Sequence, residues 1–227
     1  WISGSFRGRK TMNKIFAVGD IHGCVEMLRR LMRMIAADLA RDTLVFIGDY
    51  IDRSRGGPQV IDDLRALREE SRNVICLRGN HEAMLQNYLD GVEEDLYLAN
   101  GGAATLAAYG IAPADSPRER KEKIPAAHRR FLESLLPCYE TQDFIFVHAG
   151  LRPGIALGEQ SVEDLLWIRR DFIDSDYDFG KRVVFGHTPR GEPLVDAGKV
   201  GIDTGAVYGG RLTAVELPAV IFYQVES

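Results

Sequence analysis

The chain has 227 residues, of which 45% are hydrophobic and 27% charged, the balance of an ordinary globular protein with one substantial core. Its formal net charge of -5 argues against a general nucleic-acid binder, because such proteins carry a basic surplus. No apolar run is long enough to span a membrane, and the three widely spaced cysteines form neither a disulfide framework nor a zinc motif. We expect a cytoplasmic protein without nucleic-acid or membrane partners, in which a local positive pocket can still bind an anion.

The first thirteen residues lack the continuous apolar segment of a secretion signal. We expect residues 1–13 to form a flexible extension, with Met12 as a candidate start. Residues 14–227 are expected to form a single domain.

Short segments rich in Val, Ile and Phe recur along the chain, and each is followed at once by a polar cluster. They predict buried strands at residues 14–18, 43–47, 73–77, 144–148 and 182–186. Helical periodicity of apolar residues lies between the first of them, in residues 28–35 and 60–67. This alternation predicts an α/β layered fold with crossover connections.

The middle and the end of the chain have different patterns. Residues 83–136 are rich in Ala and Leu and contain the charged stretch "DSPRERKEK", which predicts a helical insertion over one edge of the sheet with a solvated surface. Residues 192–225 alternate apolar residues with Gly and Pro, which predicts a closing set of antiparallel strands.

The polar clusters after the strands read "GDIHG", "GDYIDR", "RGNHE", "VHAG" and "FGHT". Loops at the carboxyl ends of strands converge on one crevice in open α/β folds. Taken singly, each such Asp is readily a helix cap and each His a core residue. However, four of the five histidines follow these strands, and only His128 lies elsewhere. The sequence therefore predicts that a set of distant side chains meets in space: Asp20, His22, Asp49, Asn80, His148 and His187.

Such a set has the chemistry of a metal site. Mixed imidazole, carboxylate and amide ligands suit Mn, Fe or Zn, and the absence of thiolates argues against a structural zinc site. Six ligands hold two ions if one carboxylate bridges them, and Asp49 is the natural candidate. A dinuclear centre can activate a bridging hydroxide and clamp a phosphoryl group for in-line attack.

Further residues beside the clusters complete this chemistry. The guanidinium groups of Arg53 and Arg78 match phosphate oxygens. His81 is free to act as general acid, and Asp52 is placed to orient it. A surface ion pair between Asp52 and Arg53 is the alternative explanation for those two residues.

Cys24 raises a different possibility, since Arg30 follows it as in a cysteine-dependent phosphatase. A thiolate phosphatase cradles phosphate with backbone N–H groups in a loop between Cys and Arg. The residues after Cys24 contain no glycine and continue an amphipathic helix. We therefore expect Cys24 to be a small apolar residue at a helix start.

The series "GD-x-HG", "GD-x-x-DR", "RGNHE", "H" and "GHT" resembles the signature of the metallophosphoesterase superfamily. It is most similar to the small bacterial and bacteriophage serine/threonine phosphatases of the phosphoprotein phosphatase group (lambda phosphatase-like). The likeness runs from Lys14 to about Glu216 and includes "NGG", "LLWIRRDF", "FGHTP" and "IDTGAVYGGRLT". Two positions depart from it: Ser54 stands where the group usually has Gly, and "HAG" replaces "HAD" or "HGG".

The resemblance implies an α/β/β/α metallophosphatase sandwich with mixed β-sheets and a centre of two divalent ions, with Mn favoured over Fe or Zn. It assigns the metal ligands as a set: Asp20, His22 and Asp49 for the first ion, and Asp49, Asn80, His148 and His187 for the second. It makes His81 and Asp52 the acid pair and assigns phosphate binding to Arg53, Arg78, Arg169 and Asn80. Arg170, beside Arg169, is an alternative third arginine.

The leading expectation from these features is a cytoplasmic phosphomonoesterase acting on phosphoserine and phosphothreonine, with phosphotyrosine as a further candidate. Its partner would be a phosphoprotein or a small phosphorylated molecule. A dinucleoside tetraphosphate hydrolase of the same superfamily is the alternative, although "YIDRS" keeps the "DR" from which symmetrically cleaving relatives usually depart. A non-catalytic phosphoprotein-binding pseudo-enzyme is less favoured, because Asp49, Asp52 and His81 are all present.

Overall fold

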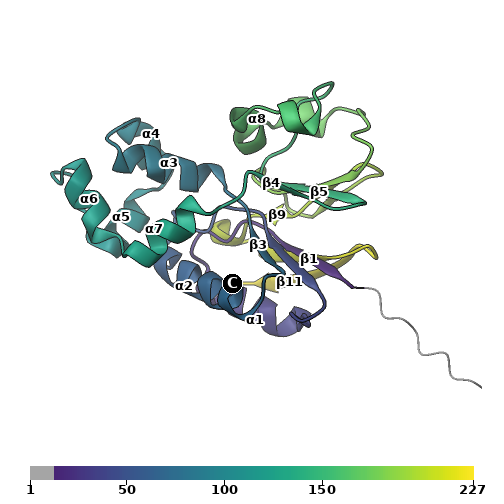
Figure 1. Ribbon diagram of the computed structural model, residues 1–227, viewed down its shortest axis with the longest axis horizontal. Coiled ribbons are helices and arrows are strands. Elements are labelled where there is room, and N and C mark those ends of the chain that lie inside the picture. The colour runs from purple at the N-terminus through teal and green to yellow at the C-terminus, as the bar shows by residue number, and fades with distance from the viewer. Residues whose placement is uncertain (1–12) are drawn as a thin grey trace, which may run out of the picture.

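The computed structural model describes residues 13–227, so the extension expected over residues 1–13 lies outside the described residues, apart from Asn13. Two β-sheets face each other and carry helices on their outer sides (Figure 1). The expected α/β/β/α sandwich with mixed sheets is confirmed by this arrangement.

The first sheet has the strand order β11-β10-β1-β2-β3, with β9 paired to β10. Its strands are β1 (Ile15–Val18), β2 (Thr43–Phe46), β3 (Val74–Cys76), β9 (Asp203–Thr204), β10 (Arg211–Leu217) and β11 (Ile221–Glu226). The three strands β1, β2 and β3 are parallel, and their last residues Val18, Phe46 and Cys76 are in register. The loops that follow them therefore leave the sheet at one edge.

The second sheet has the order β4-β5-β6-β8-β7. Its strands are β4 (Cys138–Glu140), β5 (Phe144–Val147), β6 (Arg182–Phe185), β7 (Leu194–Val195) and β8 (Lys199–Gly201). The strands β5 and β6 are parallel, with Phe146 opposite Val184, so their following loops also leave at a common edge.

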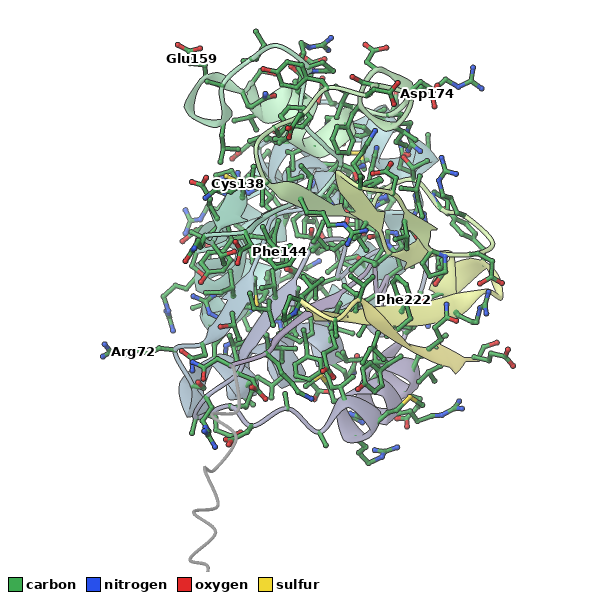
Figure 2. All side chains as sticks on the ribbon, turned by 90° about the vertical axis from the view of Figure 1, so that its right-hand side faces the viewer. Arg72, Cys138, Phe144, Glu159, Asp174 and Phe222 are labelled. Atoms are coloured by element: carbon green, nitrogen blue, oxygen red, sulfur yellow. The ribbon has the colours of Figure 1, made fainter. Side chains whose placement is uncertain are left out.

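Alternation along the strands builds the three layers of the core. Ala17 and Val45 point between the sheets, whereas their neighbours on β1 and β2 pack under the helices of the first sheet. On β5, Phe146 likewise points between the sheets and Val147 packs under the helices of the second. Figure 2 labels Phe144 of β5 and Phe222 of β11, both of which pack against the core between the sheets.

Helices cover the outer faces. On the first sheet these are α1 (Val25–Ile35) and α2 (Gly57–Glu70), and on the second they are α8 (Val162–Trp167) and α9 (Arg170–Ile173), preceded by the short η1 (Leu157–Glu159). Leu28, Leu31 and Ile35 are buried on one side of α1, which explains the periodicity seen in the sequence. A further short turn, η2 (Ala206–Tyr208), precedes β10.

The region of residues 83–136 is helical, and its helices lie to one side of the sheets (Figure 1). They are α3 (Asn80–Leu89), α4 (Glu94–Ala99), α5 (Ala103–Tyr109), α6 (Pro117–Lys123) and α7 (Ala126–Glu133). None of the helices between residues 13 and 227 is both long and apolar enough to cross a bilayer.

The closing strands differ from expectation in one respect. β10 and β11 are antiparallel, but β8 pairs with β6 in parallel, so the expected all-antiparallel set was wrong there. The physical reason is that alternation of apolar residues marks a strand without specifying its partner. The chain crosses back through β7 before β8, and so reaches β6 running in the same direction.

Candidate metal centre

Five loops that follow β1, β2, β3, β5 and β6 bring their polar side chains to one place between the two sheets. Eight non-glycine residues of the described chain have positive φ, and five of them belong to these loops: His22, Asp49, Asp52, Arg53 and His187. Left-handed backbone is unfavourable for such residues and persists where the surrounding structure fixes it. The concentration of strain in these loops marks the site independently of residue chemistry.

The first ligand group contains His22, Asp49 and His81, whose ligand atoms lie within 4.8 Å of one another. The His22 Nδ1 lies 2.8 Å from the carbonyl oxygen of Ile51. Because a carbonyl only accepts, Nδ1 carries the proton and Nε2 presents its lone pair 3.5 Å from Asp49 Oδ2. This orientation is that of a metal-binding imidazole.

The second group contains Asp49, His148 and His187 within the same 4.8 Å limit. His148 Nδ1 donates to the carbonyl of Ile47 at 2.9 Å, so its Nε2 presents a lone pair towards Asn80 Oδ1, also 2.9 Å away. Two acceptors facing each other at this distance suit a shared cation. Asn80 Oδ1 also lies 3.0 Å from His187 Nδ1, and Asp49 belongs to both groups.

Asp20 belongs to neither group, although the sequence singled it out as a ligand of the first ion. Its carboxylate is buried and accepts the backbone N–H of His187 at 3.1 and 3.2 Å. Gly186 permits this approach, because a Cβ there would lie 2.1 Å from Asp20 Oδ1. Asp20 thus joins the loop after β1 to the loop after β6, and its ligand role stays a prediction.

The histidines differ in protonation. Burial lowers the pKa of His22 to about 3 and that of His187 to about 2, and it also lowers the pKa of His148. Burial acts on His81 in the same direction, but the charges of Asp49 and Asp52 outweigh it and raise the pKa of His81. The surroundings therefore favour the neutral imidazole at His22, His148 and His187, which leaves a lone pair for a cation, and favour the doubly protonated imidazolium at His81. This supports the acid role of His81 over the ligand role that its position in the first group would allow.

The donor set fits divalent cations. Asp20, Asp49 and Asp203 are buried together, and burial with mutual repulsion raises the pKa of Asp20 and brings that of Asp203 to about 6. Concentrated buried carboxylates are what a metal ion stabilises, and these His and Asp residues are positioned to bind metal ions.

Arg53 and Arg169 lie beside different parts of the centre, as their contacts show. The Arg53 guanidinium contacts His22 Nε2 and lies 5.1 Å from the ring centroid of Tyr208. Arg169 follows α8 and reaches Thr188 at 3.5 Å. Arg78 is half-buried, and its side chain forms no hydrogen bond or ion pair with any residue from 13 to 227, while its backbone N–H donates to Leu136.

Ser54 and Cys24 have structural roles. The Ser54 hydroxyl donates to the carbonyl of His22 at 2.7 Å, so the serine that replaces the usual glycine joins the loops after β1 and β2. Cys24 immediately precedes α1, and burial raises the pKa of its thiol. A raised thiol pKa disfavours the reactive thiolate, which agrees with the apolar role expected for Cys24.

Sequence reasoning missed four buried residues that support the site. Glu82 accepts the backbone N–H groups of Asp49, Tyr50 and Gly79 at 2.8–3.0 Å, and so locks the loop after β2 onto the start of α3. Its place in "RGNHE" was the available signal. The others are Asp203, Tyr97 and Thr105; Tyr97 and Thr105 come from the helical insertion, where nothing in the local sequence distinguishes them.

Known proteins are similar to this chain over nearly its whole length. Residues 13–214 match the family described as Calcineurin-like phosphoesterase. The serine/threonine-protein phosphatase 1 of Salmonella typhimurium is 32% identical over 214 residues, covering 92% of this chain and 94% of that protein. The asymmetrical bis(5'-nucleosyl)-tetraphosphatase PrpE of Bacillus thuringiensis is 28% identical over 237 residues, covering 92% and 93%. A solved structure assigned as a diadenosine tetraphosphatase superposes with a TM-score of 0.73 at 22% identity, covering 96% of this chain and 95% of its own, and shares the fold.

Proposed function

The chain belongs to the Calcineurin-like phosphoesterase family and is a metallophosphoesterase. On that premise we propose that it is a dinuclear phosphomonoesterase that acts on phosphoserine and phosphothreonine, with phosphotyrosine as a further substrate. The observation that carries this proposal is the acid pair beside the ligand groups. His81 Nδ1 lies 2.7 Å from Asp52 Oδ2, and His81 Nε2 lies 3.9 Å from Asp49 Oδ2. A proton donor is thereby set against the ligand that both groups share.

The expected ions would be held by the residues assigned from the sequence. They are Asp20, His22 and Asp49 on one side, and Asp49, Asn80, His148 and His187 on the other. When bound, two divalent ions supply Lewis acidity that lowers the pKa of water and withdraws charge from the phosphoryl group. Manganese is the proposed metal.

The remaining steps belong to side chains of the protein. Arg53, which contacts His22, and Arg169, which contacts Thr188, can each orient phosphate oxygens. His81 presents Nε2, which is buried and unpaired among the described residues, to the oxygen of the leaving group. As an oxygen from water forms its bond to phosphorus, the P–O bond to the leaving group breaks. The Nε2 proton passes to the oxygen of that group, which therefore leaves as a neutral alcohol and not as an alkoxide.

A turnover assay tests this proposal. Protein supplied with Mn²⁺ is expected to hydrolyse aryl phosphates and a phosphoserine peptide, and chelation is expected to abolish the activity. His81→Asn should lower turnover of the peptide by about 10²–10⁴-fold with unchanged metal content. Arg118→Ala, on an exposed side chain of α6, is the control and should retain full activity. Metal-loaded protein that turned over no phosphomonoester would exclude the proposal, and it would favour the phosphoprotein-binding alternative.

A second candidate, hydrolysis of dinucleoside polyphosphates, is favoured by the pocket beside Arg53. This pocket has a volume of 440 Å³ and is lined by Arg53, Ala99, Asn100, Gly101, Val207 and Tyr208. Tyr208 is 62% exposed, and an exposed phenol ring can stack on a nucleobase. The similarity to the tetraphosphatase PrpE points the same way.

Parallel assays separate the two candidates. A phosphoserine peptide turned over with higher kcat/KM than diadenosine tetraphosphate supports the phosphomonoesterase. The reverse order, together with a Tyr208→Ala variant that raises KM for the dinucleotide alone, would support the second candidate.

A further inference from the structure

The helical insertion reaches the acid pair through one fully buried side chain. Tyr97 of α4 is 0% exposed, and its hydroxyl donates to Asp52 Oδ1 at 2.7 Å. The other oxygen of Asp52 lies 2.7 Å from His81 Nδ1. Each carboxylate oxygen therefore has one partner, and a continuous hydrogen-bonded chain runs from Tyr97 through Asp52 to His81.

Thr105 of α5 gives Asp52 a second contact with the insertion. The backbone N–H of Asp52 donates to Thr105 Oγ1 at 2.9 Å. Burial, followed by the adjacent charge of Asp52, raises the pKa of Tyr97 well above its usual value. The phenol consequently stays protonated and acts as a donor to the carboxylate.

Packing leaves Tyr97 little freedom to move. A Cβ at Gly102 would lie 2.4 Å from Tyr97 Cε1, so the Tyr97 ring packs directly on the backbone of Gly102, where no larger residue would fit. On another side its centroid lies 5.2 Å from that of Tyr88. Asp52 itself has a φ of 69°, a strained conformation that needs support from its neighbours. Without the Tyr97 hydroxyl, one oxygen of a fully buried carboxylate would have no donor from this side, which is unfavourable.

We propose that Tyr97 is a positioning residue for proton transfer, which holds Asp52 so that Asp52 orients the His81 imidazole towards the leaving group. This rests on the proposed function, in which His81 Nε2 gives its proton to the leaving oxygen as the P–O bond breaks. The imidazole becomes neutral in that step and keeps its Nδ1–H bond to Asp52. The insertion thus contributes to catalysis through Tyr97, in addition to any contribution of its surface to substrate choice.

The dependence of rate on the leaving group tests this role. Phenyl phosphate and a phosphoserine peptide need a proton at the leaving oxygen, whereas p-nitrophenyl phosphate releases a stable anion. With Mn²⁺ saturating, Tyr97→Phe should lower kcat about 10–100-fold for the first two substrates, as for other partners that orient a functional side chain. The loss should stay within about threefold for p-nitrophenyl phosphate, because that reaction gains little from general acid catalysis.

Tyr88→Phe is the matched control, since it removes a hydroxyl from the ring packed on Tyr97 without touching the bonds to Asp52. It should leave the leaving-group dependence unchanged. In an Asp52→Ala background, Tyr97→Phe should have no further effect on kcat, because its action passes through Asp52. Metal content and Tm are measured for every variant.

The outcomes separate this inference from the function on which it rests. Wild-type turnover of the phosphoserine peptide establishes the proposed function regardless of the variants. A Tyr97→Phe loss that is equal for all three substrates, or absent for all, overturns the positioning role. A full additional loss in the Asp52→Ala background overturns it as well.

Discussion

Asp49 is the residue on which both ligand groups depend. Its two oxygens lie 3.5 Å from His22 Nε2 and from His148 Nε2, respectively, and its backbone N–H is fixed by Glu82. We predict that Asp49→Asn reduces binding at both ions together, by about 10–100-fold each, because the bridging position loses its charge. Titration calorimetry with Mn²⁺ measures this directly.

Asp52→Asn is the counterpart that distinguishes binding from catalysis. Asp52 contacts His81, Tyr97 and Thr105 but belongs to neither ligand group. The Asp52→Asn variant should retain two ions, while its turnover of the phosphoserine peptide falls. Retention of normal affinity by Asp49→Asn, or loss of the ions from Asp52→Asn, would contradict these assignments.

Gly79 marks how closely the backbone must pass Asp49. A Cβ at Gly79 would lie 2.1 Å from Asp49 Oδ1 and 2.4 Å from the Asp49 backbone nitrogen, and backbone cannot give way as a flexible side chain can. Gly79→Ala is therefore expected to cost about 1–3 kcal/mol of stability and to weaken Mn²⁺ binding. Gly158→Ala, where the space is open, is the control for denaturant unfolding. Equal stability of the two variants would show that the loops relax.

The strands β1, β2, β3, β5 and β6 could be predicted from sequence because their residues form continuous apolar runs, and the helices α1 and α2 because burial imposes a helical period on each; β4 was not predicted. The loop residues could also be placed together, since strands that run parallel end at one edge of the sheet. The support from the insertion could not be predicted. Tyr97 meets Asp52 across 45 residues of sequence, and such a contact depends on how α4 packs, which no local pattern specifies. The same holds for the parallel pairing of β8.

His128, the histidine outside the site, connects three helices. Its Nδ1 lies 2.8 Å from the Tyr109 hydroxyl on α5, and its Nε2 lies 2.9 Å from Asp62 on α2, while His128 itself is on α7. We predict that His128→Leu lowers the free energy of unfolding by about 1–3 kcal/mol, because the half-buried Tyr109 hydroxyl loses its partner. Denaturant unfolding of metal-loaded protein measures the loss.

The His128→Leu variant is expected to lose stability but not catalytic activity. At temperatures where His128→Leu remains folded, its kcat on p-nitrophenyl phosphate should match the wild type, because His128 is in neither ligand group. A large fall in kcat without a fall in stability would instead connect this bridge to the site.

The buried histidines and carboxylates with shifted pKa values lie together where the two sheets meet. The stability of the metal-free protein therefore depends on pH. The pKa of His22 is lowered to about 3 and that of His187 to about 2, chiefly by burial. The unfolded chain takes up these protons near pH 6.5, and the folded chain does not. Stability is therefore lost as pH falls below about 6.5.

The buried carboxylates act in the opposite direction. Burial raises the pKa of Asp203 to about 6 and that of Glu82 to about 7. Their contribution is fully present below the unfolded pKa near 4 and is lost as pH rises through 6 to 7, at most about 3 kcal/mol for each group. At neutral pH the metal-free protein thus carries repelling carboxylates that bound cations would neutralise.

We predict that stabilisation by Mn²⁺ grows as the pH rises. Metal binding needs an ionised Asp20, and burial beside Asp203 and Asp49 raises the pKa of that carboxyl well above its usual value, so a proton competes with the ions there as the pH falls. The difference in Tm between Mn²⁺-loaded and chelated protein should be larger at pH 8 than at pH 5.5. In the chelated protein, Asp203→Asn should remove part of the stability loss that accompanies a rise in pH from 4 to 6. A metal-induced shift that is constant over this range would contradict the proposed ligand set, because that set requires proton release on binding.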